Sequence, residues 1–360
     1  MKHNNHENSQ IIKIGPDSLE ELPDLIRGCA HKALLVHGHR PVEDGLLTKV
    51  RILLNKEQVP YANMGQILPN PTYKSVKRGI KIARKENCDV IIALGGGSTL
   101  QCAKGIALGL HYKGDVWDFW TGKKKPKKTC PIASVMTNPS SGAELSTSCT
   151  LVKKGERKTI HDPSLKCTFA ILDPKLSMYP LFPTMNQAFG LFIHLFFAAL
   201  ETDDEKQLEE AITLIKDLFL AADQLKMNQD DLEARTSLFK IGYQSHTKLN
   251  VSKCSIESIA SNLSFKYSLT EGTAGSMLFI AWLKSLNQKQ KERSIEIAKE
   301  AFSADINQFE QALSLFKKQL QSVGLPLSIP ESGLIISDEE LKKHAVDQQT
   351  KEILLNSNKP

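Results

Sequence analysis

A short apolar run followed at once by glycines is the feature that most restricts the fold of this chain. Val90 to Leu94 reads VIIAL, Gly95-Gly96-Gly97-Ser98 follows directly, and Thr99 to Leu110 is compatible with a helix. Wholly apolar strands are typical of parallel sheets covered on both faces. Glycines at such a turn let the backbone approach a pyrophosphate, and the next helix directs its N-terminal amides at the charge. The segment predicts a phosphate-binding turn, although a tight structural turn would use the same residues and the GxGxxG fingerprint is absent.

The surrounding sequence alternates strand-like and helix-like segments. Further strands are predicted over Lys32–Val36, Val59–Ile67 and Phe169–Leu172, and helices over Pro41–Lys56 and Thr72–Asn87. Such alternation is typical of parallel βαβ units. We therefore expect an α/β fold that begins with a Rossmann-like parallel-sheet domain.

From about Leu181 the pattern changes to long helical segments with few β-branched runs. Helices are predicted over Met185–Leu200, Asp204–Leu225, Gln229–Ser245, Ile256–Phe265, Thr273–Leu286 and Glu292–Val323. We expect a disordered tail over residues 1–10, a dinucleotide-binding α/β domain over 11–181 and an all-helical C-terminal domain over 182–360.

Composition excludes several classes of protein. The chain has 360 residues, 41% hydrophobic and 24% charged, as in folded soluble proteins. Its formal charge of +6 is too small for its length to indicate nucleic acid, and we assign no function to the lysine-rich run Lys123–Lys128. The predicted partners therefore include no nucleic acid.

The cysteines and the apolar runs predict a cytoplasmic protein. The seven cysteines are odd in number and form no CxxC pair, which fits reduced thiols. Residues 1–10 have no apolar core and cannot act as a secretory signal. The longest apolar run, Phe189 to Leu200, has 12 residues and is interrupted by His194, whereas a membrane span needs about 20. We expect no membrane segment.

A series of landmarks in order resembles one known family. The landmarks are Pro69-Asn70-Pro71-Thr72, Asp89 to Ser98, Ala103-Lys104, Ile171-Leu172-Asp173-Pro174, Gly324-Leu325-Pro326 and Ser332-Gly333. Together they resemble the iron-type, or group III, alcohol dehydrogenases over nearly the whole chain. Thr137 to Ser146 is similar to the substrate-side loop of the NADP-preferring aldehyde-reductase branch. The resemblance implies a dinucleotide lying across the glycine turn, in the cleft between two domains, and a homodimer formed through edge strands of the first domain.

The segment after the first strand bears on the choice of cofactor. Members that favour NAD often carry an acid there, which would repel a 2′-phosphate, whereas this chain has Gly38, followed by His39 and Arg40, which can complement a phosphate. NADP(H) is therefore favoured over NAD(H), although both basic residues would also suit an exposed loop. Lys158 resembles a family lysine near the cofactor. The predicted cofactor-binding residues are Gly38, Arg40, Gly95, Gly96, Gly97, Ser98, Thr137 and Lys158.

The metal site that the resemblance implies is degenerate in this chain. Family members hold a divalent metal through an Asp and a His four residues apart and two later histidines, and that metal polarises the alcohol or carbonyl oxygen. The four positions correspond to Phe192, Phe196, Glu257 and Glu271. A phenyl ring cannot coordinate a cation, so we expect no iron or zinc at this site.

Three further positions depart from the family pattern or lie close to it. Gln101 replaces the acid of the usual GGGSxxD turn, and Ser261 stands where many members have another histidine. His194 lies two residues from each of the first two ligand positions and is expected to be a packed histidine. Glu257 and Glu271 are expected to turn to water or to pair with a base such as Lys266.

Two functions stay open from the sequence. The first is an NAD(P)-dependent oxidoreductase that interconverts a small alcohol and a carbonyl compound, with metal-dependent catalysis lost; His194, Glu257 or Glu271 would have to act as the acid. The second is a catalytically inactive family member that binds a dinucleotide or serves a structural role. A related lyase chemistry would also need the missing histidines. Catalytic residues therefore stay unassigned.

Overall fold

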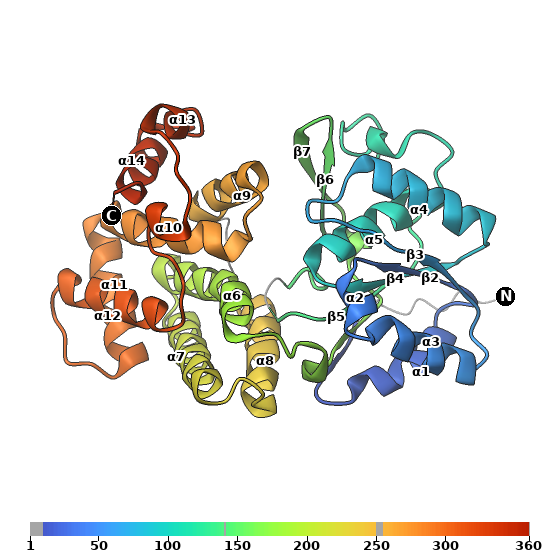
Figure 1. Cartoon of the computed structure of the whole chain (residues 1–360), viewed down its shortest axis with the longest axis horizontal. Coiled ribbons are helices and arrows are strands. Elements are labelled where there is room, and N and C mark those ends of the chain that lie inside the picture. Colours follow the sequence, from blue (N-terminus) through green and yellow to red (C-terminus); the bar gives the residue numbers. More distant parts are fainter. Residues whose placement is uncertain (1–9, 140–141, 250–254, 360) are drawn as a thin grey trace. The chain divides into compact units, whose positions relative to one another are not determined.

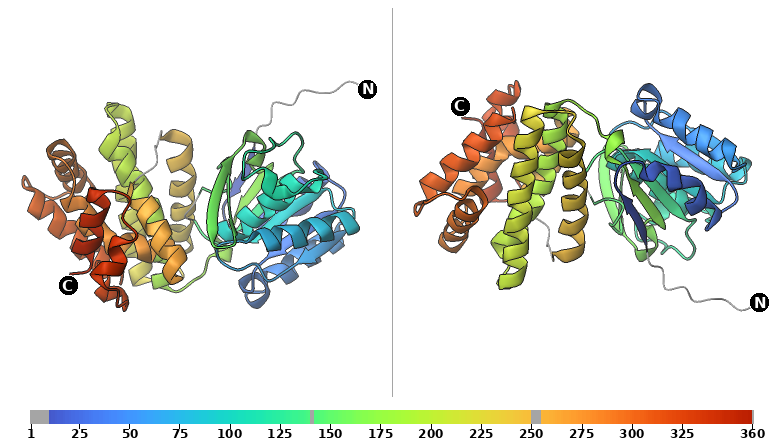
Figure 2. Two further views of the ribbon diagram at one scale, coloured as in Figure 1. Left: turned by 90° about the horizontal axis from the view of Figure 1, so that it is seen from above. Right: turned by 90° about the horizontal axis from the view of Figure 1, so that it is seen from below.

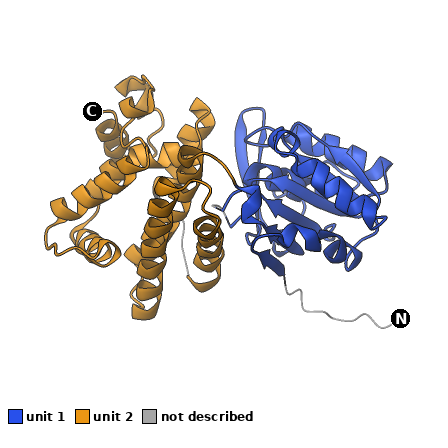
Figure 3. Cartoon of the chain, turned by 60° about the horizontal axis from the view of Figure 1, so that its bottom comes forward, with its two compact units in different colours: residues 1–177 blue, residues 178–360 orange. Residues whose placement is uncertain are grey.

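The chain divides into two compact units, which are coloured separately in Figure 3: unit 1 over 1–177 and unit 2 over 178–360. The computed structural model describes residues 10–139, 142–249 and 255–359. The observed division follows residue 177, four residues before the predicted one, which lies at Leu181, the first residue of a helix. Most of the predicted tail is outside the described residues. Its last residue, Gln10, donates a hydrogen bond to the carbonyl oxygen of Glu144 at 2.6 Å.

Unit 1 is built on a six-stranded, wholly parallel sheet, as the alternating sequence predicts. In spatial order its strands are β1 (Ile11–Ile14), β8 (Phe169–Leu172), β5 (Ile132–Met136), β4 (Val90–Gly95), β2 (Ala33–His37) and β3 (Tyr61–Met64). A separate antiparallel hairpin, β6 (Ser148–Lys153) with β7 (Glu156–His161), completes the strands of the described residues. This hairpin was not predicted.

Helices cover both faces of the sheet (Figure 1). Helices α1 (Leu22–Arg27) and α3 (Leu46–Lys56) pack on one face, and α4 (Tyr73–Lys85) and α5 (Gly97–Leu110) lie on the other. Alternate residues of a strand point to opposite faces, so a strand covered twice must be apolar throughout. The VIIAL run of β4 is buried at every position for this reason.

Unit 2 consists of helices in its described part, and Figure 2 shows them packed on one another in two views. They are α6 (Leu181–Glu201), α7 (Glu205–Met227), α8 (Leu232–Lys248), α9 (Ser255–Tyr267), α10 (Glu271–Lys284), α11 (Gln288–Phe302), α12 (Phe309–Ser322), α13 (Asp338–Lys342) and α14 (Gln348–Ser357). Their apolar faces form a single core. The predicted architecture, an α/β domain followed by an all-helical region, is confirmed.

Helix α6 is the one helix of the described chain that is long and apolar enough to span a membrane, with a mean hydropathy of 1.2 over its best window. Of that window, 61% is buried inside the structure. Such burial is the pattern of a core helix, because a helix in the middle of a protein is apolar on most sides.

Two predicted helices are each divided in the structure. The segment predicted as one helix from Pro41 to Lys56 forms α2 (Arg40–Glu43) and α3, because Gly45 between them has a left-handed backbone, with φ of +75°. The segment predicted from Glu292 to Val323 forms α11 and α12. Ser303 ends α11 at φ of +49°, and the Gln311 side chain accepts from the Gln308 backbone at the start of α12.

Candidate functional site

The glycine turn lies at the carboxyl end of β4 and leads directly into α5. Gly95 ends the strand at φ of +140°, a conformation that side chains disfavour, and Gly96 precedes the helix without offering a side-chain cap. The first backbone amides of a helix have no partner within the helix, and the helix dipole places partial positive charge there. This end of the sheet therefore offers amide donors to an anion.

The order of the strands places this turn at the topological switch point of the sheet. From β2 the chain moves outward to β3, and from β4 it moves the other way to β5, while β2 and β4 lie side by side. In open parallel sheets, ligands bind outside the carboxyl ends of the strands at such a point. The segments that follow β2 and β4 therefore lie at the same end of the sheet. They carry the predicted Gly38, Arg40 and Gly96–Ser98, and Gly95 ends β4.

Position 38, in the loop after β2, is a glycine and not an acid. A Cβ added to Gly38 would lie 3.1 Å from the carbonyl oxygen of Ile67, so the position is confined by backbone. The His37 ring is buried and lies 2.8 Å from the carbonyl oxygen of Gly38, and burial lowers its pKa. Arg40 is half exposed, with its Nε 3.8 Å from Asp44. The loop is thus neutral or cationic at its start.

Asn138 completes the turn and is a residue that the sequence did not single out. Strand β5 continues beside the glycines, since the Thr137 backbone donates to the Gly95 carbonyl at 3.2 Å. A Cβ added to Gly96 would come within 2.9 Å of the Asn138 side-chain amide nitrogen. The Oδ1 atom of Asn138 is buried and has no hydrogen-bond partner among the described residues. Buried polar atoms rarely lack a partner, so this oxygen is an acceptor that a bound ligand could use.

Lys104 fixes the loop that follows this turn. Its side chain is fully buried, and Nζ donates to the carbonyl oxygens of Ala143, Ser146 and Ser148 at 2.7, 2.6 and 3.3 Å. Burial lowers the pKa of Lys104. On the same helix, the Gln101 side chain accepts from the Thr150 backbone at 2.8 Å. Helix α5 therefore holds the segment between β5 and β6, and Gln101, where the family pattern has an acid, takes part in that attachment.

Lys158 lies on the hairpin, away from the residues gathered at the glycine turn. It pairs with Glu156 of the same strand at 3.3 Å and lies opposite Leu151 of β6. The structure brings together Gly38, Arg40, the glycines and Thr137 around the ends of neighbouring strands, but gives no contact between them and Lys158.

Phe192 and Phe196 lie inside the core of unit 2. They are 1% and 0% exposed, and their ring centroids are 5.6 Å apart. Both rings contact Phe279 of α10, at 5.3 and 5.6 Å, and Phe316 of α12, at 6.1 and 5.3 Å. Edge-to-face contacts of this kind stabilise an aromatic cluster. The first two ligand positions of the family are thus occupied by packed apolar rings.

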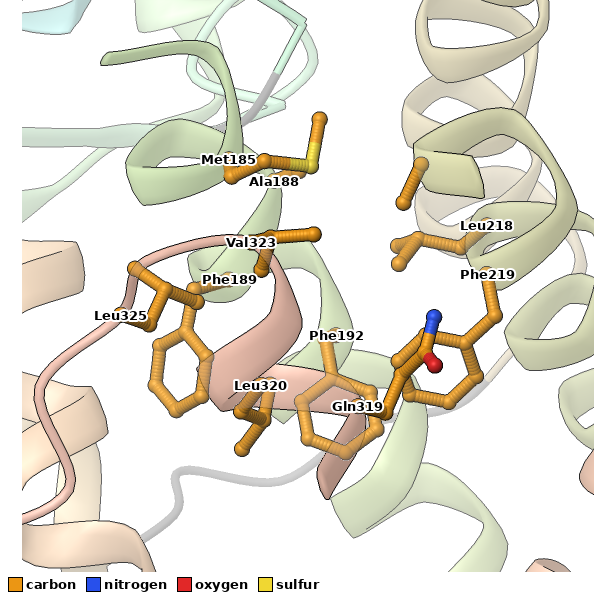
Figure 4. A pocket seen from close by; sticks show the side chains of 11 residues that line it. Met185, Ala188, Phe189, Phe192, Leu218, Phe219, Gln319, Leu320, Val323 and Leu325 are labelled. Atoms are coloured by element: carbon orange, nitrogen blue, oxygen red, sulfur yellow. The ribbon is translucent and has the colours of Figure 1, made fainter. Parts of the chain in front are cut away.

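A small cavity borders this cluster, and Figure 4 shows its lining. Its volume is about 20 Å³, and Met185, Phe189, Phe192 and Phe219 contribute apolar walls, with Gln319 as the polar lining residue. A cavity of roughly 10–15 Å³ holds one water molecule, and apolar cavities stay dry. This cavity is therefore too small for an alcohol or aldehyde substrate.

Glu257 and Glu271 are exposed on the surface of α9 and α10. Glu271 accepts a hydrogen bond from the Ser261 hydroxyl at 3.2 Å. Phe279, the α10 residue that touches both phenylalanines, lies eight residues further on, about 12 Å along the helix at 1.5 Å per residue. Exposure of both acids is one of the two expected arrangements; Lys266, the base named in the other, pairs with Glu340 at 3.1 Å and contacts His344 at 2.9 Å.

The donor set does not fit the metal that the family name implies. Two of the four ligand positions hold buried phenyl rings, and the two acids are exposed on α9 and α10. Within residues 10–139, 142–249 and 255–359, no three His, Cys, Asp or Glu side chains gather closely enough to hold a metal ion. Iron or zinc coordination at this place would need ligands that these positions do not supply.

His194 packs against a second histidine. Its ring centroid lies 4.3 Å from that of His246 on α8, and its Nε2 is buried with no hydrogen-bond partner in the described chain. Burial, and to a smaller extent the nearby His246, lower the pKa of His194 to about 4, although a backbone hydrogen bond with Ser245 opposes the shift. Burial also lowers the pKa of His246. Both rings are therefore neutral at pH 7, and the expected packed role of His194 fits this environment.

The histidine pair predicts a loss of stability in mild acid. The folded pKa of His194, about 4, is below its ordinary 6.5. The free energy of unfolding should therefore not depend on this group above pH 6.5. It should fall as the pH drops from 6.5 to 4, because only the unfolded state then takes up the proton, and the loss is complete below 4. The full difference is about 3 kcal/mol. Urea unfolding of His194→Phe, measured from pH 7.5 to 4.5, should show a weaker pH dependence than the parent, whereas exposed His161→Gln should follow the parent. Identical curves for His194→Phe and the parent would contradict the assignment.

Comparison with known proteins agrees with this fold and turn. A parallel sheet with a glycine turn at its switch point is the architecture of dinucleotide-binding folds. The profile of the family described as iron-containing alcohol dehydrogenase matches residues 9–174. The solved structure of an NADH-dependent butanol dehydrogenase A from Thermotoga maritima superposes with a TM-score of 0.88 at 23% identity, covering 97% of each chain.

Curated relatives extend this similarity along the sequence. An NADH-dependent butanol dehydrogenase A from Clostridium acetobutylicum is 25% identical over 346 residues, which are 90% of this chain and 87% of that protein. The NADPH-dependent aldehyde reductase YqhD from Escherichia coli is 29% identical over 191 residues, or 51% of this chain and 48% of that protein. The chain is thus similar to iron-containing alcohol dehydrogenases, by the family profile over its first part and by these relatives along most of its length.

Proposed function

We propose that this protein binds NADP(H), in preference to NAD(H), on the glycine turn of unit 1, and that it lacks the metal-dependent alcohol and aldehyde interconversion of its family. The observation that carries the second statement is the burial of Phe192 and Phe196 in an aromatic core. Metal-free carbonyl reduction is the alternative that keeps the protein an enzyme. Cytoplasmic location and a homodimer through an edge strand, β1 or β3, remain predictions.

The residues of unit 1 fit a dinucleotide. The backbone amides at Gly96, Gly97 and Ser98 would donate to the pyrophosphate. When bound, the nicotinamide supplies or accepts the hydride. The chain itself would position the dinucleotide through the glycine turn and keep the following loop in place through Lys104.

The preference for NADP(H) rests on the loop after β2. A carboxylate at position 38 would repel a 2′-phosphate, and this chain has Gly38 there with the Arg40 guanidinium two residues further on. Arginine pairs with phosphate through two parallel hydrogen bonds, so its contribution is larger than that of a simple charge.

Cofactor titration tests this preference. Nicotinamide fluorescence should show NADPH binding at least tenfold tighter than NADH, and Arg40→Glu should abolish that ratio, a change of about 1.4 kcal/mol or more. Lys49→Glu makes the same charge change on an exposed position of α3 and should leave the ratio intact. Equal affinity of the parent for both cofactors, or no binding of either, would remove the proposal.

Metal analysis tests the loss of the metal site, and assays with a panel of carbonyl compounds distinguish an inactive protein from a metal-free enzyme. After loading with Fe²⁺ or Zn²⁺ and desalting, the protein should hold far less than one equivalent of metal. One equivalent that disappears in the double variant Glu257→Ala/Glu271→Ala would show a metal site after all. Turnover of aldehydes with NADPH that is independent of added metal and lost in a glycine-turn variant would favour the metal-free enzyme.

A further inference from the structure

The formal charge of the chain is unevenly divided between its two units. Residues 1–177 contain 27 lysines and arginines and 16 acids, whereas residues 178–360 contain 19 and 24. Unit 1 therefore carries +11 and unit 2 carries −5, and the +6 of the whole chain conceals this difference. A strongly basic unit attracts polyanions over distances comparable to the Debye length.

Much of this excess lies on one helix and the segment beside it. Helix α4 contains six basic residues and no acid, and the loop between α5 and β5 adds six lysines. The exposed basic residues are Lys74, Lys77, Arg78, Lys81, Arg84 and Lys85 on α4, Lys113, Lys123, Lys124, Lys125, Lys127 and Lys128 on the loop, and Lys154 at the turn of the β6–β7 hairpin. We call this set the basic face.

Contacts join these segments into one surface. The Tyr73 hydroxyl donates to Asp115 at 2.6 Å, and the Lys153 ammonium lies 4.1 Å from the centre of the Tyr73 ring. At the other end of α4, the Arg84 guanidinium donates to the carbonyl oxygen of Leu110 at 3.0 Å. The start of α4 thus touches both the loop and the hairpin, and the end of α4 touches the start of the loop.

The basic face has few counterions of its own. Asp118 accepts from the Tyr112 hydroxyl at 2.8 Å and lies 3.7 Å from Lys123. Within the described residues, the lysines of α4 have no carboxylate partner within 4 Å; Lys77 instead lies over the Tyr73 ring at 5.4 Å. The Cβ atoms of residues three and four apart on a helix are about 5–6 Å apart, and like charges at such positions repel. An anionic partner would relieve this repulsion.

We propose that the basic face binds the phosphate backbone of nucleic acid without regard to sequence. Basic side chains on successive helical turns can each neutralise a phosphate, and the release of counterions supplies the affinity. A lipid surface fits less well, because interfacial helices also bury large apolar side chains, and the large exposed apolar side chains of the described chain lie outside 72–128 and 153–158. This proposal replaces the expectation of no nucleic-acid partner, which rested on the whole-chain charge.

The basic face is separate from the dinucleotide site. None of its members lies in the segments directly after β2 and β4, or in Thr137 and Asn138 directly after β5. Nucleic-acid binding therefore stands or falls independently of cofactor binding, and the two can be measured on the same variants.

Fluorescence anisotropy with labelled 20-nucleotide single strands of DNA and RNA, and with a 20-base-pair duplex, tests the proposal. At 50 mM NaCl we expect micromolar affinity for the parent. If three or four phosphates are neutralised, the affinity for single strands should fall by about 20- to 50-fold between 50 and 200 mM NaCl. Lys74→Glu/Lys77→Glu/Lys81→Glu should weaken binding at least tenfold at 50 mM NaCl, with unchanged circular dichroism.

A variant of equal net charge separates the basic face from charge in general. Lys206→Glu/Lys216→Glu/Lys284→Glu changes three exposed lysines of unit 2 and gives the same total charge. It should bind nucleic acid like the parent, within threefold. Equal losses in both triple variants would overturn the proposal, as would no binding by the parent at 50 mM NaCl. Binding to phosphatidylserine vesicles without binding to any of the nucleic acids would also overturn it.

Discussion

Phe192→Asp is expected to destabilise unit 2 by more than about 4 kcal/mol. Removing a buried phenyl ring alone costs 3–5 kcal/mol, and burying an unpaired carboxylate among apolar groups costs more. Phe192 is 1% exposed, and its ring contacts four other phenylalanine rings of the core besides Phe196. Urea or thermal unfolding of the purified variant measures the loss, and a variant recovered only as aggregate agrees with it.

Phe182→Asp is the matched control on the same helix. Its side chain is 46% exposed, so the substitution should change the free energy of unfolding by less than about 1 kcal/mol. The double variant Phe192→Asp/Phe196→His recreates the residue types of the first two family ligands, and added Fe²⁺ or Zn²⁺ should not rescue its stability. Phe192→Asp with parent-like stability, or metal-dependent rescue of the double variant, would contradict the loss of the metal site.

The sequence was most informative where the polypeptide pattern is repeated and local. The VIIAL run, its glycines and the following helix are found within a residue or two of their predicted bounds, because burial on both faces requires continuous apolar side chains. Most of the long helices of unit 2 were predicted for the same reason: their apolar positions recur at helical spacing.

The sequence was less informative where structure depends on single residues or on distant partners. Ser303 adopts a left-handed backbone that a periodicity argument does not detect, so two helices were predicted as one. Asn138 belongs to the candidate site only because β5 lies beside β4, a pairing between residues about 40 apart in the chain. Likewise, Lys266 pairs with Glu340 from a distant helix instead of the acids nearer in sequence.

The opposite charges of the units show a similar limit. Net charge is a property of a surface, and its meaning depends on which residues share that surface. The run from Lys123 to Lys128 has no assignable function alone. The loop that carries this run contacts both ends of α4, and we therefore group the run with the basic face.

Gly96→Val is expected to weaken NADPH binding at least 100-fold while leaving the fold intact. The backbone at Gly96, with φ of −95° and ψ of −168°, is one that valine readily adopts, so no strain arises there. The added side chain would meet Asn138 at about 3 Å and occupy the place where phosphate oxygens approach the amides. Losing two charge-assisted hydrogen bonds, each worth about 1.5–3 kcal/mol, corresponds to 100-fold or more. Fluorescence titration measures the affinity, and urea unfolding measures the stability.

Gly28→Val supplies the control for Gly96→Val. Gly28 is exposed at the end of α1, and a Cβ there meets only backbone oxygens at 3.6 and 3.7 Å, which is ordinary contact. Its NADPH affinity should equal that of the parent. If Gly96→Val retains the parent's affinity, the glycine turn is a structural turn, and the dinucleotide proposal fails. Gly95→Val is a further comparison, because φ of +140° at Gly95 strains any side chain there. Only this variant should lose stability. A loss of stability in Gly96→Val as well would indicate a local folding defect and not a blocked phosphate site.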